Sequence, residues 1–269
     1  MYGNVKGASP SAAGCRTEKE APKMSGLLYK NFRLNLSSMI FSLITAAVSC
    51  LTMILVCLFA FVLPGKTPEV EQLNDLTLGF GACYFLAFWL PSMATSTLFQ
   101  VDESKTCCAF AMSLPQGAKG HIEAKYYYML ILNLSIMFVT FVSDTVTTAM
   151  TGGMTSNTVI IIIVFALVLL LSAIETPFMV RFGSQRGLAI KGAVVGGVFI
   201  FAALYFLFGD ITWLIENEND PLTALMEWLQ SGDIVFWLSL FPFISVAAFY
   251  LSCRISVKLF RKGAESYEQ

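Results

Sequence analysis

Six long apolar stretches divide this 269-residue chain. They lie at about 38–63, 77–99, 126–149, 157–178, 192–214 and 234–253. Each is near the roughly 20 apolar residues that a helix needs to cross the hydrocarbon core of a bilayer. The apolar positions run on without the alternation of a membrane β-barrel, so helices are the structure that satisfies their backbone in lipid. The pattern therefore predicts an all-α polytopic membrane protein with six transmembrane helices.

Two shorter amphipathic patterns lie outside the predicted spans. Between residues 27 and 36, leucine and phenylalanine recur at helical spacing with Lys30 and Arg33 among them, which predicts an N-terminal helix on the inner membrane surface. Residues 221–230 place their apolar side chains on one side of a helix. This second pattern predicts a short outer helix between spans five and six.

The ends of the chain differ in composition from the six-span part. Residues 1–23 are rich in Gly, Ala, Ser and charge, and we expect this extension to be disordered. A more structured pattern begins at Met24, which we expect to be the physiological start. Residues 24–262 then form the six-span domain, and residues 263–269 form a cytoplasmic tail.

Basic residues are sorted between the two sides of the predicted membrane. All Lys and Arg residues except Lys66 precede span one, follow span six, or lie in the second and fourth connecting segments. An excess of Lys and Arg marks the cytoplasmic side, so both termini are expected there. Only 13% of the residues are charged and 56% are hydrophobic, which is too little charge for the surface of a soluble protein of this size.

Several motifs that would indicate enzymatic chemistry are incomplete. Gly65-Lys66-Thr67 resembles the end of a phosphate-binding loop, but Ala60 stands where that loop requires its first glycine. The single histidine, His121, has no second histidine or cysteine pair beside it, and the seven cysteines contain no C-x-x-C pair. We therefore expect no enzymatic activity, cofactor or metal in this chain.

The segment between spans two and three has the most informative pattern. Asp102 and Glu103 follow an apolar run in which a central charge would cost roughly 2.5–3.5 kcal/mol, so they mark a helix leaving the membrane. Ser113 suits a helix cap and Pro115 a first helical turn. The residues predict a short cytoplasmic helix at about 114–124. They also fit a solvated connector with a helix that faces the membrane.

This segment resembles the permease family of type-2 ABC exporters, in its small six-span bacterial branch. The resemblance rests on the acidic pair, on Ser113-Leu114-Pro115 about ten residues later, and on Lys125-Tyr126 at the start of span three. Three further pieces match in the same order along the chain: Met24 to Phe32, Pro177 to Gly183, and Ser252 to Ser256. The similarity extends over about 24–262.

The resemblance implies an ATP-driven exporter in the bacterial cell membrane. In that family, a helix of this loop docks into a groove of the ATPase subunit and transmits its motion. The implied coupling residues are Asp102, Glu103, Ser113, Leu114, Pro115, Gln116, Lys119 and Glu123. ATP and Mg²⁺ would bind to separate ATPase subunits, two of which would assemble with two permeases, alike or different. The implied cargo classes are peptides, antibiotics and lipid-linked glycans.

Polar residues within the spans are candidates for a substrate path. Asp144 lies near the outer end of span three, Asn133 lies further inside that span, and Glu175 lies near the inner end of span four. Solvation at the membrane interface explains the two acids about as well, and so does pairing of Glu175 with Arg181. Asn133 and Ser135 are better explained as helix–helix hydrogen bonds than as ligands.

Small and aromatic residues also suggest where the helices meet each other and the interface. Gly192 and Gly196 have the small-x-x-x-small spacing that permits close helix packing. Tyr126, Tyr127 and Tyr128 stand where an aromatic belt is expected.

The alternative function is a self-sufficient secondary carrier or a channel-like membrane protein. Carriers place ionisable groups or broken helices near the middle of the membrane. The central thirds of all six predicted spans contain no charge, which disfavours a carrier. A membrane scaffold or sensor partner is a third class.

Overall fold

The computed structural model describes residues 25–62, 70–100, 117–152, 157–208 and 232–265. The regular structure in these ranges consists of α1 (Ser25–Leu34), α2 (Leu36–Cys57), the π-helical turn η1 (Leu58–Val62), α3 (Val70–Gln100), α5 (Gly117–Met150), α6 (Thr158–Phe182), α7 (Ser184–Phe208) and α10 (Gly232–Glu265). Six of these helices are long and apolar enough to cross a membrane. The predicted all-α architecture with six membrane-spanning helices is confirmed.

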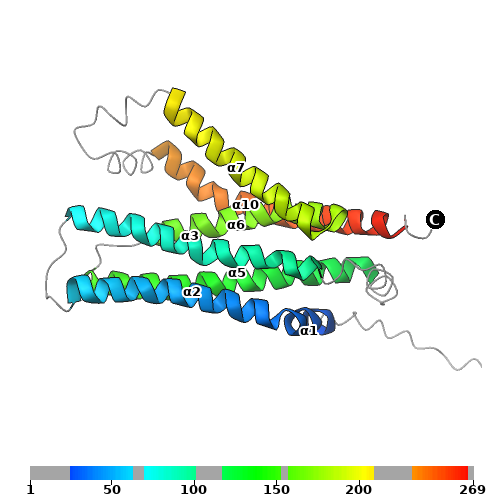
Figure 1. Ribbon diagram of the computed structural model, residues 1–269, viewed down its shortest axis with the longest axis horizontal. Helices are drawn as coiled ribbons and strands as arrows, with labels where there is room; N and C mark the ends of the chain where they lie inside the picture. The colour runs from blue at the N-terminus through cyan, green and yellow to red at the C-terminus, as the bar shows by residue number, and fades with distance from the viewer. Residues whose placement is uncertain (1–24, 63–69, 101–116, 153–156, 209–231, 266–269) are drawn as a thin grey trace, which may run out of the picture.

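The long helices lie side by side around α6 (Figure 1). α6 packs against α10, α7, α3 and α5, and α2 packs against α3 and α5. α1 lies at one end of this bundle, which we call the α1 end; there α3 ends, α5 begins, α6 meets α7, and α10 ends (Figure 1). Toward the opposite end, α7 diverges from α3 (Figure 1). The α1 end therefore brings together four of the predicted inner segments.

Bulky apolar side chains fill the inside of the bundle and also cover its outside. Tyr84, Phe88 and Ile136 are fully buried in one hydrophobic core, whereas Phe138 and Phe201 are 71% and 74% exposed. Large exposed apolar side chains recur along every long helix. Hydrocarbon chains of a bilayer would cover this surface, as expected for a membrane-spanning bundle.

The predicted N-terminal helix is present as α1, close to the predicted 27–36. A turn at Asn35 separates it from α2, and the ring of Phe32 packs edge-on against Tyr128 of α5 with centroids 5.0 Å apart. These contacts anchor α1 to the bundle, while its placement on a membrane surface stays a prediction. The extension 1–23 and the predicted outer helix 221–230 lie outside the described residues.

Two helices begin earlier than the sequence predicts. Span five was expected from residue 192, yet α7 begins at Ser184, because Gly183 alone joins it to α6. Gly183 has a φ of 94°, which only glycine adopts readily. A second glycine makes the junction tight: a Cβ at Gly187 would overlap the Met179 side chain and lie 3.1 Å from its Cα.

The other early start concerns the predicted separate helix at 114–124. Residues 117–124 instead form the first two turns of α5, which continues without interruption through span three to Met150. α5 begins at Gly117, whose φ is 56°, and contains no proline that would end it. The prediction of a helix distinct from span three is therefore wrong for residues 117–124.

Candidate functional site

The last turn of α3 is held by a buried lysine from α5. Lys125 is 2% exposed, and its Nζ donates a hydrogen bond to the backbone carbonyl of Leu98 at 3.0 Å. The same ammonium lies 4.2 Å from the centre of the Phe99 ring. Carbonyls in the last turn of a helix lack partners within that helix, and a cation there also interacts favourably with the helix dipole. Lys125 therefore links the two helices that flank the predicted coupling loop.

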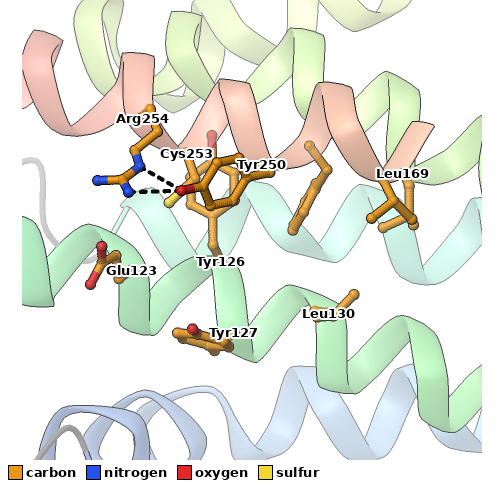
Figure 2. Close-up of a pocket in the computed structure, with 10 residues that line it drawn as sticks. Glu123, Tyr126, Tyr127, Leu130, Leu169, Tyr250, Cys253 and Arg254 are labelled. Carbon is orange, nitrogen blue, oxygen red and sulfur yellow. Dashed lines mark hydrogen bonds between the residues drawn. The ribbon is translucent and has the colours of Figure 1, made fainter. Parts of the chain in front are cut away.

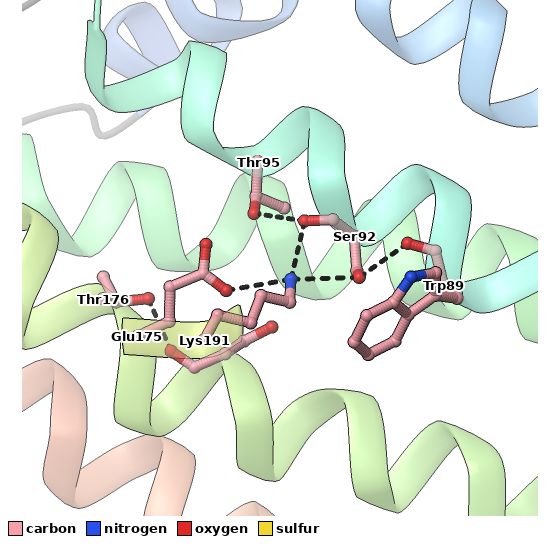
Figure 3. Close-up of polar contacts among 7 residues, drawn as sticks. Trp89, Ser92, Thr95, Glu175, Thr176 and Lys191 are labelled. Atoms are coloured by element: carbon pink, nitrogen blue, oxygen red, sulfur yellow. Dashed lines mark hydrogen bonds and ion pairs between the residues drawn. The ribbon is translucent and has the colours of Figure 1, made fainter. Parts of the chain in front are cut away.

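A second buried lysine reaches α3 from α7. Lys191 Nζ lies 2.9 Å from Glu175 Oε2 of α6 and 3.0 Å from both the carbonyl oxygen and the hydroxyl of Ser92 (Figure 3). The side chains of Lys191 and Glu175 are 1% and 2% exposed. Thr95 also donates to the Ser92 carbonyl, at 2.7 Å. This cluster joins α3, α6 and α7 close to the α1 end.

The pairing of Glu175 differs from the sequence interpretation. Arg181, which was considered as its partner, is exposed, and Lys191 takes that position instead. The reason is the one-residue junction at Gly183, which brings the start of α7 back along α6. Lys191 was counted among the loop cations because counting charges treats every lysine as solvated. The sequence signal for such a pair is an acid in an apolar run, followed by a proline or glycine that can turn the chain and then by a lysine.

The predicted coupling residues lie mostly outside the described part of the chain. These are Asp102, Glu103, Ser113, Leu114, Pro115 and Gln116. Lys119 and Glu123 lie on the first turns of α5 and form an ion pair at 3.8 Å, one helical turn apart. Lys119 is exposed and Glu123 is half-buried. Both lie at the α1 end, where the loop joins the start of α5.

Asp144 forms hydrogen bonds that connect three helices at the end opposite α1. It is 3% exposed and accepts from the Tyr84 hydroxyl at 3.4 Å, from the Asn157 backbone N–H at 3.0 Å and from the Thr158 hydroxyl at 2.9 Å. Asn157 is the N-cap of α6, and its side chain makes no capping bond. The carboxylate of Asp144 therefore satisfies a donor at the start of α6 and complements the helix dipole there.

Asn133 does not join Asp144 and Glu175 in one polar path. Its side chain donates to Met129 of its own helix at 2.9 Å, and Ser135 likewise donates to Ile131 at 2.8 Å. Both bonds are within α5, so among the described residues these two side chains form bonds inside their own helix and not the expected bonds between helices. Asp144 of α5 bonds to the start of α6, whereas Glu175 lies near the end of α6. These two places are about 25 Å apart along α6. A role in a substrate path stays a prediction for all three.

Tyrosines at the start of span three are buried rather than collected in an interface belt. The Tyr126 hydroxyl shares hydrogen bonds with Ser252 at 2.7 Å and Ser256 at 2.8 Å on α10. Tyr128 is also buried, and only Tyr127 is exposed. The belt prediction is therefore wrong for two of the three, because one side of this helix faces α10 and α1.

No metal site is formed by the described residues. Within them, no group of three or more His, Cys, Asp or Glu side chains is arranged to hold a metal ion. The buried polar groups at the α1 end instead include two lysines and one acid, together with backbone carbonyls and the hydroxyls of Ser92 and Thr95. Such an arrangement can bind helices to one another and transmit a displacement between them.

Comparison with known proteins gives one family. The sequence model described as ABC-2 family transporter protein matches residues 26–261 of the chain. No curated protein and no solved structure matches it. The matched part begins in α1, ends in α10 and includes all six membrane-spanning helices.

Proposed function

Because this chain belongs to the ABC-2 transporter family, we propose that it is the permease subunit of an ATP-driven exporter whose ATPase is a separate chain. The match over residues 26–261 on a bundle of six membrane-spanning helices is the observation that carries the proposal. Membrane subunits of this family work with ATPase partners in general. ATP and Mg²⁺ would then bind to the partner and not to this chain.

The contacts at the α1 end support a coupling role for the loop between α3 and α5. Lys125 bonds the last turn of α3 to α5, so a displacement of the loop would act on both helices together. Lys191 and Glu175 extend the connection from α3 to α6 and α7. An ATPase docked at Asp102 to Glu123 would therefore act on four membrane-spanning helices through buried polar contacts.

The distribution of charge supports a cytoplasmic position for the α1 end. Exposed or half-buried basic residues gather on this end: Lys30, Arg33, Lys119, Arg181, Arg186, Lys258, Arg261 and Lys262. This is the side on which Lys and Arg accumulate in membrane proteins. Both termini of this multi-pass protein would then face the cytoplasm of a bacterial cell, where ATP is available. Two permeases, identical or different, would form the path for a peptide, antibiotic or lipid-linked cargo.

Affinity purification of the full chain from its native membrane in mild detergent tests this proposal. We expect a P-loop ATPase in near-stoichiometric amount, identified by mass spectrometry. Reversing the acidic pair with Asp102→Lys and Glu103→Lys, or introducing Leu114→Asp, should remove the ATPase while the chain stays inserted. The matched control reverses two acids between predicted spans one and two, Glu69→Lys and Glu71→Lys, and should retain the ATPase.

Two results would contradict the proposal. Recovery of the wild-type chain without any ATPase would favour the secondary carrier, with Asp144 as the first residue to test. Equal recovery of the ATPase with the inner and outer charge reversals would remove the coupling assignment from this loop.

A further inference from the structure

A cavity of about 370 Å³ lies between α5 and α10 near the α1 end (Figure 2). This volume is within the roughly 300–1,000 Å³ of ligand-binding pockets in proteins. One end of the cavity is polar, with Glu123, Tyr250 and Arg254, and the other end is apolar, with Leu130 and Leu169 (Figure 2). Phe249 also lines the cavity. The polar and apolar parts of the cavity therefore match a ligand that has a charged head group and an apolar tail.

Arg254 gives the polar end its capacity to bind an anion. Its guanidinium donates to the Tyr250 hydroxyl at 3.1 and 2.7 Å, a neutral partner, and the Glu123 carboxyl offsets part of its positive charge. Among the described residues, Arg254 makes no ion pair. Glu123 lies at the same end, but its charge is offset by Lys119 at 3.8 Å, and Lys258 follows Arg254 by one turn of α10. The balance at this end is positive, and a guanidinium presents the planar donor fork that matches phosphate.

The cavity opens on the outer surface of α5 and α10, among exposed apolar and aromatic side chains. Leu169 and Phe249 are buried at its base, whereas Tyr127, Val246 and Tyr250 on its rim are exposed on the membrane-facing surface of α5 and α10. An inorganic anion would leave the apolar part empty. A ligand that fills both parts carries a hydrocarbon chain and enters sideways from the bilayer.

We propose that this cavity binds one anionic phospholipid, with its phosphate at Arg254 and one acyl chain along Leu130, Leu169 and Phe249. Basic pockets between membrane-spanning helices on the cytoplasmic side are known to bind anionic head groups. The assignment to the inner leaflet rests on the orientation proposed above, whereas the binding site itself does not depend on an ATPase partner. A bound lipid would bridge α5 and α10, and so stabilise the packing of α10 against the bundle.

Native mass spectrometry of the full chain in mild detergent, titrated with phosphatidylglycerol and with phosphatidylcholine, tests the proposal on the wild-type protein. We expect one phosphatidylglycerol to bind at least tenfold more tightly than phosphatidylcholine. Arg254→Gln should abolish this preference. The matched control is Arg261→Gln, which removes the same charge from the same helix at an exposed position outside the cavity, and should keep it.

A second pair of variants tests the apolar part of the cavity. Val246→Trp fills the cavity and should reduce phosphatidylglycerol binding several-fold. Ile244→Trp, two residues earlier on α10 and outside the lining, should leave binding unchanged. A thermal melt of each variant distinguishes loss of the site from loss of the fold.

Four outcomes would overturn the proposal, and the first two need no variant. They are equal binding of the two lipids, and equal competition by inorganic phosphate, which would indicate an anion site without a lipid chain. The others are equal losses in Arg254→Gln and Arg261→Gln, and unchanged binding in Val246→Trp. Recovery of the ATPase is measured separately, so failure of the lipid site and failure of the exporter proposal give different results.

Discussion

Lys191 Nζ and Glu175 Oε2 form a close pair inside the bundle, 2.9 Å apart and almost completely buried. Removing two charges from water costs several kcal/mol per ion, and a close pair compensates only when further hydrogen bonds satisfy the remaining groups. Ser92 supplies two such oxygens to the ammonium at 3.0 Å. Removing either partner alone therefore leaves an uncompensated buried charge.

We predict that Lys191→Met destabilises the protein by about 3–5 kcal/mol, because it leaves Glu175 buried without a cation. The measurement is the free energy of unfolding of the purified chain in detergent micelles. Lys258→Met, an exposed lysine at the same end, is the control and should change it little. The double variant Glu175→Gln and Lys191→Met should recover most of the loss. A double variant as unstable as Lys191→Met alone would contradict the pairing.

For Asp144, the hydrogen bonds predict a structural effect. Asp144→Ala removes the acceptor of the bonds from Tyr84, Asn157 and Thr158. An unsatisfied buried donor such as the Asn157 N–H costs about 1–3 kcal/mol. We expect a clear fall in melting temperature, whereas Thr145→Ala, at the next and exposed position of α5, should change it little. A variant that melts like wild type but fails to transport would instead place Asp144 on the substrate path.

The sequence could not predict which side chains pair with the buried acids and lysines. Asp144 and Glu175 were recognised as unusual, since acids inside apolar runs require compensation. Their partners lie on other helices, or beyond a turn whose length the sequence does not reveal. Lys125 and Lys191 were assigned to loops, because a lysine that bonds a carbonyl of another helix is indistinguishable in sequence from a solvated one.

At the scale of elements, the junction between α6 and α7 decides where span five begins. Gly183 turns the chain in one residue, and Gly187 allows α7 to pass Met179 with no side chain between them. The hydropathy pattern placed this boundary at residue 192, since Arg186 and Lys191 interrupt the apolar run. Hydropathy predicts where a helix can contact lipid, while the helix itself continues wherever its backbone and charges are satisfied.

This junction predicts opposite effects for two glycine substitutions on α7. Gly187→Ala should destabilise the protein by about 1–3 kcal/mol, because its Cβ would force Met179 and its backbone to move. Gly192→Ala has nothing within 4 Å of its Cβ and should be neutral or stabilising by up to about 1 kcal/mol through helix propensity. Thermal melts of the two variants under the same conditions give the comparison. Equal melting temperatures would contradict the tight junction.

For the whole molecule, the number and type of helices could be predicted because lipid imposes a simple requirement on the chain. Backbone groups must be satisfied within each span, so long apolar runs form helices. Which helix lies at the centre could not be predicted in the same way. α6 is apolar on all sides, and that is compatible with lipid or with a protein core, since both are hydrocarbon-like. The central position of α6 follows from the one-residue link to α7 and from its packing against α10.

The outer surface of α7 has the features of a contact between two copies of the chain. Val198, Phe199, Ile200 and Phe201 are exposed there, and lipid can cover such side chains. Gly196 presents bare backbone, with nothing within 4 Å of a Cβ built on it. Small residues on a membrane-spanning helix allow a second helix to approach closely, and the proposed exporter requires a second permease. We therefore expect two copies to meet along α7, with Gly196 at the contact.

Gly196→Leu should lower the dimer fraction of the purified chain several-fold, because the larger side chain holds the two helices apart. The monomer should not be destabilised, since leucine has a higher helix propensity than glycine. Gly79→Leu is the control: it makes the same change on α3, where a Cβ also meets nothing within 4 Å. Native mass spectrometry over a range of protein concentrations measures the dimer fraction. A monomeric wild-type chain, or equal loss of dimer in both variants, would show that α7 does not join two copies, and the second permease would then be a different chain or bind through another helix.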